Sequence, residues 1–217
     1  MDISLFKGNR LFAFSNLSAF INYATTFAVS FILSLYLQYV KGMSPRDTGL
    51  LLISQPVLMT IVSTFSGRLS DKFDPRILSS VGMAITVTGL VLLTFISATT
   101  SNLYISISLV ILGSGFGLFS SPNTNSVMGS VSKQYLGIAS ATLGTMRITG
   151  QMMSLGLATL MIHLFIGDAH ITPAVHQPFI HSIRLLFLIF TGLSILGIFA
   201  SLARGKKEVP PVSVTLP

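Results

Sequence analysis

The chain has 217 residues, of which 51% are hydrophobic and only 9% charged, and its mean hydropathy is +0.78. A soluble domain carries about 25% charged residues, so this composition excludes an ordinary water-exposed surface and indicates a lipid bilayer as the solvent. The net charge of +7 does not indicate nucleic-acid binding, because the basic residues fall in gaps between apolar runs, and the absence of cysteine excludes a disulfide framework.

Six apolar runs follow one another, and each is long enough to cross about 30 Å of hydrocarbon. We expect helices over Leu11–Tyr39, Pro45–Gly67, Pro75–Ala98, Leu103–Gly129, Gln134–Phe165 and Phe179–Ala203. Ser44 and Asp74 each precede a proline, which predicts a capping side chain followed by proline at the first helical position. Pro122 interrupts the fourth run, where we expect a kink.

The distribution of basic residues predicts the orientation of these helices. Lys41 and Arg46 lie on one side, and nine lie on the other: Lys7, Arg10, Arg68, Lys72, Arg76, Lys133, Arg204, Lys206 and Lys207. Because basic loops stay in the cytoplasm, both termini are expected to be cytoplasmic. The predicted architecture is therefore an all-α integral membrane bundle of six transmembrane helices over residues 1–207, followed by a disordered cytoplasmic tail, 208–217.

Arg147 stands about a dozen residues into the fifth run, near the middle of the bilayer, and no acidic residue lies deeper in the six runs than Asp47, at the start of the second. An unpaired cation in hydrocarbon costs several kcal/mol, so it usually faces a partner, a cavity or water. Ser140, Gly144, Gln151 and Ser154 share its helix face by their spacing of three and four residues. We expect this stripe to line a substrate cavity or to contact a second bundle. Close helix packing, with Arg147 turned inward, is the alternative.

Other polar residues in the runs are weaker candidates for the same cavity. These are Asn22, Gln38, Gln55, Asn123 and Asn125, for which hydrogen bonds between helices or repair of the kink at Pro122 are the alternatives. Arg184, near the start of the last helix, is expected to reach the non-cytoplasmic surface. The glycines at 113, 115 and 117 indicate close packing, and the four histidines around residues 166–178 do not have the spacing of a metal site.

The segment from Gly67 to Arg76 reads GRLSDKFDPR. By its residues alone it is either a charged cytoplasmic turn or a contact to a neighbouring helix start. It resembles the signature loop of the major facilitator superfamily, G-x-L-[AS]-D-[RK]-x-G-[RK]-[RK], although Asp74 and Pro75 depart from that pattern. The resemblance implies a conformational latch between bundles, formed by Gly67, Arg68, Asp71, Lys72 and Arg76.

Three further segments, Leu35–Leu52, Ser121–Val131 and Gly137–Gln151, resemble the fourteen-helix drug:proton antiporter branch of that superfamily. The resemblance implies the C-terminal six-helix half of a plasma-membrane exporter of drug-like or amphipathic small molecules. It also implies no cofactor, a proton gradient as the energy source, and a second bundle of six or eight helices, or a self-copy, as partner. A truncated, non-transporting membrane protein or an interaction scaffold is the alternative. A subunit of an ATP-driven importer is disfavoured by the short cytoplasmic gaps, and an enzyme by the lack of a nucleophile–base–acid set.

Overall fold

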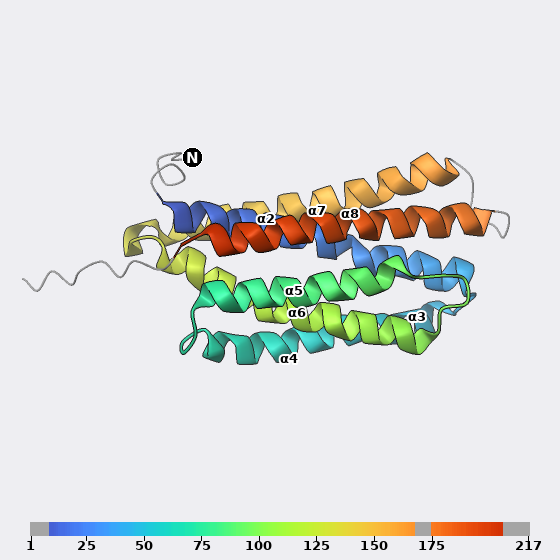
Figure 1. The fold of residues 1–217 in the computed structure, drawn as a ribbon, viewed down its shortest axis with the longest axis horizontal. Coiled ribbons are helices and arrows are strands. Elements are labelled where there is room, and N and C mark those ends of the chain that lie inside the picture. Colours follow the sequence, from blue (N-terminus) through green and yellow to red (C-terminus); the bar gives the residue numbers. More distant parts are fainter. Residues whose placement is uncertain (1–8, 168–174, 206–217) are drawn as a thin grey trace, which may run out of the picture.

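The computed structural model describes residues 9–167 and 175–205, and these form helices connected by short turns (Figure 1). The elements are α2 (Arg10–Leu35) with a π-helical turn (Tyr36–Val40), α3 (Pro45–Leu52), α4 (Ser54–Leu69), α5 (Pro75–Thr94), α6 (Asn102–Gly129), a 3₁₀ turn (Lys133–Tyr135), α7 (Leu136–Ile166) and α8 (His176–Ala203). With α3 and α4 taken as one span, the described part of the chain has six helices long and apolar enough to cross a membrane, as expected. The predicted tail, 208–217, lies outside the described residues.

Both predicted helix starts have the expected caps. The Ser44 hydroxyl accepts a hydrogen bond from the backbone N–H of Asp47 at 3.1 Å, and the Asp74 carboxylate accepts one from the N–H of Arg76 at 2.9 Å. In each case a proline occupies the first turn, where its missing N–H would have no partner in the helix.

Two of the helices differ clearly from the expected ones. The second predicted helix is broken at Ile53, because Pro56 cannot donate a hydrogen bond to the carbonyl of Leu52. The third helix ends at Thr94 instead of Ala98. The fourth helix continues through Pro122 to Gly129, as expected.

The helices form two layers (Figure 1). In one layer α5 packs against α8, and in the other the order is α7, α2, α6 and α4, with α5 against α6 and α8 against α2. We call the side of this second layer that is turned away from α5 and α8 the four-helix face. Both ends of the described chain, Asn9 and Gly205, lie at one end of the bundle, which we call the termini end.

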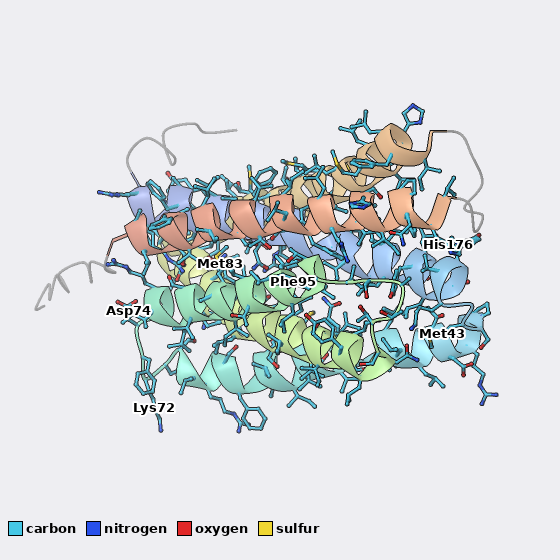
Figure 2. The ribbon with its side chains drawn as sticks, turned by 45° about the vertical axis from the view of Figure 1, so that its right-hand side comes forward. Met43, Lys72, Asp74, Met83, Phe95 and His176 are labelled. Atoms are coloured by element: carbon cyan, nitrogen blue, oxygen red, sulfur yellow. The ribbon has the colours of Figure 1, made fainter. Side chains whose placement is uncertain are left out.

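The core runs along the contact between the two layers. Its main cluster joins residues of α2, α5, α6 and α8, including Tyr36, Leu90, Leu112 and Phe187, all of which are fully buried. Met83 of α5 is also fully buried and lies inside the bundle (Figure 2). Its methyl group faces Gly197 of α8. By contrast, α4 buries only Ser66, so it is the most exposed helix.

Glycines allow α6 to approach two helices closely, as the sequence predicts. A Cβ at Gly113 would lie 2.3 Å from the carbonyl oxygen of Gln55 in α4, and one at Gly117 would lie 2.6 Å from that of Met59. On another side of α6, a Cβ at Gly115 would lie 2.6 Å from both the backbone nitrogen and the hydroxyl of Thr86 in α5. Such contacts with backbone cannot be relieved by turning a side chain, so these helices would have to separate.

Substituting Gly115 with alanine should therefore destabilise the bundle. We expect Gly115→Ala to lower the free energy of unfolding by about 1–3 kcal/mol, seen as a lower thermal unfolding midpoint of the purified protein in detergent. Gly192→Ala is the matched control, because a Cβ there meets nothing within 4 Å and alanine favours the helix. Equal midpoints for the two variants would contradict the close packing of α5 on α6.

Candidate functional site

The arginine of the predicted stripe projects from α7 beside its contact with α2. Gly150 and Ser154 make that contact: a Cβ at Gly150 would lie 2.6 Å from the carbonyl oxygen of Phe20, and the Ser154 hydroxyl accepts a hydrogen bond from the N–H of Ala28 at 3.0 Å. Arg147 precedes Gly150 by three residues, which places it about 60° around the helix, and its half-buried side chain points toward α2 and α6. Close packing of small residues thus sets the position from which the arginine extends.

Three helices meet at the guanidinium of Arg147. Its Nη2 donates a hydrogen bond to the hydroxyl of Thr124 in α6 at 2.7 Å, and its central carbon lies 5.6 Å from the ring centroid of Tyr23 in α2. Tyr23 is held in turn by an edge-on contact with Phe116, with centroids 5.1 Å apart and rings at 89°. The Thr124 hydroxyl gives its own hydrogen to the carbonyl of Ser120, which leaves a lone pair for the arginine.

The depth of this group can be read from its helices. Arg147 follows the first residue of α7 by eleven positions, or roughly 17 Å along the axis, whereas Thr124 stands five residues before the end of α6. The guanidinium therefore reaches toward the termini end and lies in that half of the span, closer to the surface than its backbone position suggests.

No carboxylate of the described chain neutralises Arg147. The described acidic residues are Asp47 in the first turn of α3, Asp71 in the turn after α4 and Asp74 at the start of α5, so none lies deeper in a span than its first turn. The contacts of Arg147 are a neutral hydroxyl and an aromatic face, and its Nε is buried without a hydrogen-bond partner among the described residues. A charge held in this way keeps much of its desolvation cost.

The rest of the predicted stripe separates into open and packed positions. Gly144 has no neighbour within 4 Å of a Cβ, Gln151 is half-buried, and Ser140 is exposed toward the start of α7. Ser154, by contrast, is fully buried against α2. The open part of the stripe therefore consists of Ser140, Gly144, Arg147 and Gln151.

The two predicted glutamines are partly exposed and make other contacts. Gln55 accepts a hydrogen bond from the Ser30 hydroxyl at 3.1 Å and so joins α4 to α2. Gln38 donates to the Ser34 hydroxyl at 2.9 Å. Gln38 stands fifteen residues beyond Tyr23, roughly 22 Å along the axis, so it does not form one site with Arg147.

The three predicted asparagines occupy three different environments. Asn22 is fully buried, and neither its side-chain nitrogen nor its oxygen has a hydrogen-bond partner among the described residues. Asn123 is buried and binds an arginine of α8, described below, whereas Asn125 is exposed and donates to the Ser70 hydroxyl at 2.7 Å. The structure therefore does not bring these amides together at one opening.

The predicted latch loop lies at the termini end, between α4 and α5. Lys72 points away from the helices there and Asp74 lies beside α5 (Figure 2), while Arg68 and Asp71 are also exposed. Gly67 lets α4 approach α6, because a Cβ there would lie 3.1 Å from the Ser121 hydroxyl. Asp71, Asp74, Arg76 and Asn125 line a cavity of about 320 Å³ at this end. The loop is thus placed to meet another protein surface, while its latch role stays a prediction.

The structure shows a second buried arginine that the sequence analysis assigned to a cytoplasmic flank. Arg204 caps the end of α8 and is 1% exposed, the largest of the fully buried side chains. Its guanidinium donates to the carbonyl and hydroxyl of Ser201, to Asn123 Oδ1 at 3.1 Å and to the Ser15 hydroxyl at 3.3 Å. Burial lowers the pKa of Arg204 to about 10, with Asp74 opposing and Arg76 adding to this effect, so it remains charged at neutral pH.

These bonds connect four helices at the termini end. Ser80 of α5 donates to the Ser201 hydroxyl at 2.8 Å, and Asn123 of α6 donates to the carbonyl of Ser15 in α2 at 3.1 Å. No sequence pattern separates Arg204 from the basic residues that follow it, because all of them end the same apolar run. Only the serines and the asparagine supplied by other helices distinguish it.

Arg184 is partly exposed and makes a structural contact at the end of the bundle opposite the termini end. Its Nε donates to the carbonyl of Ile96 just after α5 at 2.6 Å. The Tyr36 hydroxyl and the Lys41 ammonium donate to the next exposed carbonyls, of Ser97 at 2.6 Å and Thr100 at 2.9 Å. Cations are favourable at a helix C-terminus, where carbonyl groups lack partners. Arg184 therefore stabilises the end of α5 opposite the termini end.

Comparison with known proteins identifies related sequences along almost the whole chain. A family model described as Major Facilitator Superfamily matches residues 16–215. The uncharacterized transporter YebQ of Escherichia coli (strain K12) is 32% identical over 158 residues, which are 73% of this chain and 34% of that protein. The riboflavin transporter RibZ of Clostridioides difficile (strain 630) is 31% identical over 169 residues, 78% of this chain and 36% of that protein. The multidrug resistance protein Stp of Mycobacterium tuberculosis (strain H37Rv) is 24% identical over 181 residues, 82% and 33% respectively.

A solved structure has the same fold. A bacterial homolog of the human lysosomal transporter Spinster, in an inward-facing and occupied conformation, superposes with a TM-score of 0.65 and 17% identity over 92% of this chain and 50% of that one. The chain thus spans about a third of the length of the curated relatives it matches and half of the solved structure. The relatives are named as transporters and drug-resistance proteins, which indicates a transporter, not an enzyme.

Removing the buried arginine of α8 should destabilise the bundle. Arg204→Ala leaves Asn123, Ser15 and Ser201 without their donor, and we expect the free energy of unfolding to fall by about 2–4 kcal/mol. The thermal unfolding midpoint in detergent measures this loss. Arg68→Ala is the control, because Arg68 is exposed at the same end. A loss no larger than that of the control would show that the network around Arg204 contributes little.

Proposed function

The chain belongs to the major facilitator superfamily, and on this basis we propose that it forms one bundle of a secondary transporter, which works with a second bundle. Alternating access in such transporters needs two bundles that move about a shared site near the middle of the membrane. Arg147 is the observation that supports this most directly. Its charge lies on the side of α7 that faces α2 and α6, without a carboxylate from the described chain, so either water or a second protein surface must cover it.

The exposed face of α4 is consistent with a second bundle but does not require one. Large apolar side chains recur there every four residues and are 39–63% exposed: Ile53, Val57, Ile61, Phe65 and Leu69. Lipid tails could cover this stripe as well as another helix would. The apolar stripe therefore supports the proposal less than the cation does, because hydrocarbon cannot cover a guanidinium at low cost.

We propose that the transporter exports drug-like or amphipathic small molecules and that a proton gradient supplies the energy. Two relatives, one named as a multidrug resistance protein and one as a riboflavin transporter, support a small organic substrate. Proton coupling comes from the resemblance to the drug:proton antiporters. Since the only carboxylate within the described spans is Asp47, in the first turn of α3, the proton-carrying acid would belong to the second bundle.

A non-transporting scaffold is the second candidate, and the observation in its favour is the exposed surface of α4 and α7. These are the least buried of the described spans, and other membrane proteins could bind there without any transport.

A flux measurement separates these two functions. The chain is reconstituted in liposomes alone or together with the N-terminal part of one of the relatives, and the amount of fluorescein moved across the membrane under an imposed proton gradient is measured. We expect flux only when both bundles are present, because one bundle cannot enclose a site. Robust flux from a chain shown to be monomeric would contradict the proposal, and flux from a dimer would identify a self-copy as the second bundle.

The proposed location is the plasma membrane, with both termini in the cytoplasm, and the lack of cysteine makes this simple to test. Lys72→Cys, in the exposed α4–α5 turn, should be protected from a membrane-impermeant maleimide in intact cells. Thr99→Cys, in the exposed α5–α6 loop, should react. A permeant maleimide controls for access to both positions, and the reverse labelling pattern would invert the proposed orientation.

A further inference from the structure

We propose that the guanidinium of Arg147 binds the anionic group of the transported molecule, so that the substrates are amphipathic anions or zwitterions and simple organic cations are excluded. This inference rests on the proposed transport function and specifies its substrate class. It follows from the unused hydrogen-bond donors of Arg147, the open surface beside it and the aromatic wall formed by Tyr23.

Arg147 has donors to spare. An arginine carries five N–H groups, and the hydrogen bond that the structure shows from Arg147 uses one of them, on Nη2, to reach Thr124. Its Nε is buried and lacks a hydrogen-bond partner among the described residues, whereas neither Nη is buried in this way. A planar carboxylate, sulfonate or phosphate could accept from both Nη atoms together, in the bidentate geometry for which guanidinium is suited.

Space for such a group exists along the same helix face. Gly144, one turn before Arg147, has open space where a side chain would extend, and Gln151, one turn after it, is half-buried with an amide that can add a hydrogen bond. The Tyr23 ring, fixed by Phe116, forms an apolar wall next to the charge. A ligand with an anionic group beside a flat apolar part matches this combination of charge, amide and aromatic ring.

The charge also acts against the opposite class of molecule. An organic cation that approached Arg147 would meet a like charge in a region of low dielectric, with no carboxylate in the interior of the described spans to attract it. Charge alone therefore favours anions, and the guanidinium of Arg147 already occupies one face of Tyr23 that a cation could otherwise bind.

Binding of two xanthene dyes, alike in shape and opposite in charge, tests the proposal. The full chain is placed in phosphatidylcholine nanodiscs, and fluorescence anisotropy is measured with anionic fluorescein and with cationic rhodamine 123. We expect fluorescein to bind about tenfold more tightly than rhodamine 123, and Arg147→Gln to remove this preference. Arg147→Lys should keep the preference with weaker binding, because an ammonium keeps the charge but not the fork.

Arg184→Gln is the matched control, since it removes an arginine from another span while glutamine can still donate to the Ile96 carbonyl. It should leave the fluorescein preference unchanged, and thermal unfolding of each variant confirms that it is folded. Equal binding of the two dyes by the wild-type chain, no binding of either, or an unchanged preference in Arg147→Gln would overturn the proposal.

The same variants distinguish a ligand from a partner carboxylate. If Arg147→Gln keeps the dye preference but reduces the amount of second bundle that co-purifies with the chain, the guanidinium pairs with that bundle and the proposal is overturned. If the dye preference depends on Arg147 while reconstituted flux is absent with both bundles, the anion site stands and the transport function fails.

Discussion

Hydrocarbon cannot solvate a charge, and this constraint explains the arrangement of the polar residues in the bundle. Arg204 meets it by complete enclosure, with oxygen acceptors from Ser201, Ser15 and Asn123 in place of water. Arg147 meets it only in part, with one hydroxyl and one aromatic face. Arg204 is therefore a structural element. Arg147 keeps hydrogen-bond donors without partners among the described residues, as expected of a charge at a functional surface and not of one packed in the core.

One short segment of α6 serves both arginines. Asn123 accepts from Arg204 on α8, and the next residue, Thr124, accepts from Arg147 on α7. Successive residues of a helix point about 100° apart, so the two arginines approach α6 from different sides. Both residues directly follow Pro122, which removes a backbone donor from this part of the helix without ending it. Asn123, for which sequence reasoning considered substrate contact or kink repair, thus binds neighbouring helices.

Hydropathy and charge were enough to predict six spans, and proline with its preceding cap was enough to predict the starts of α3 and α5. The break at Ile53 was also readable in principle, since Pro56 marks it, but length favoured one continuous span. The site was less predictable. Helical spacing placed Gly144, Arg147 and Gln151 on one open face, yet it could not show that Gln38 lies too far along the bundle to join them, or that Asn123 is enclosed. Arg204 was missed because its burial depends on oxygen atoms from other helices, which no local pattern records.

The contacts of α6 have a mechanical consequence. Its glycines lie against backbone of α4 on one side and of α5 on another, and its residues 123 and 124 bind α8 and α7. A shift or rotation of α6 alone would break contacts in several directions at once. The six spans would then tilt together as a rigid body. In the proposed transporter, the change that exposes Arg147 to one side of the membrane or the other takes place where the four-helix face meets the second bundle.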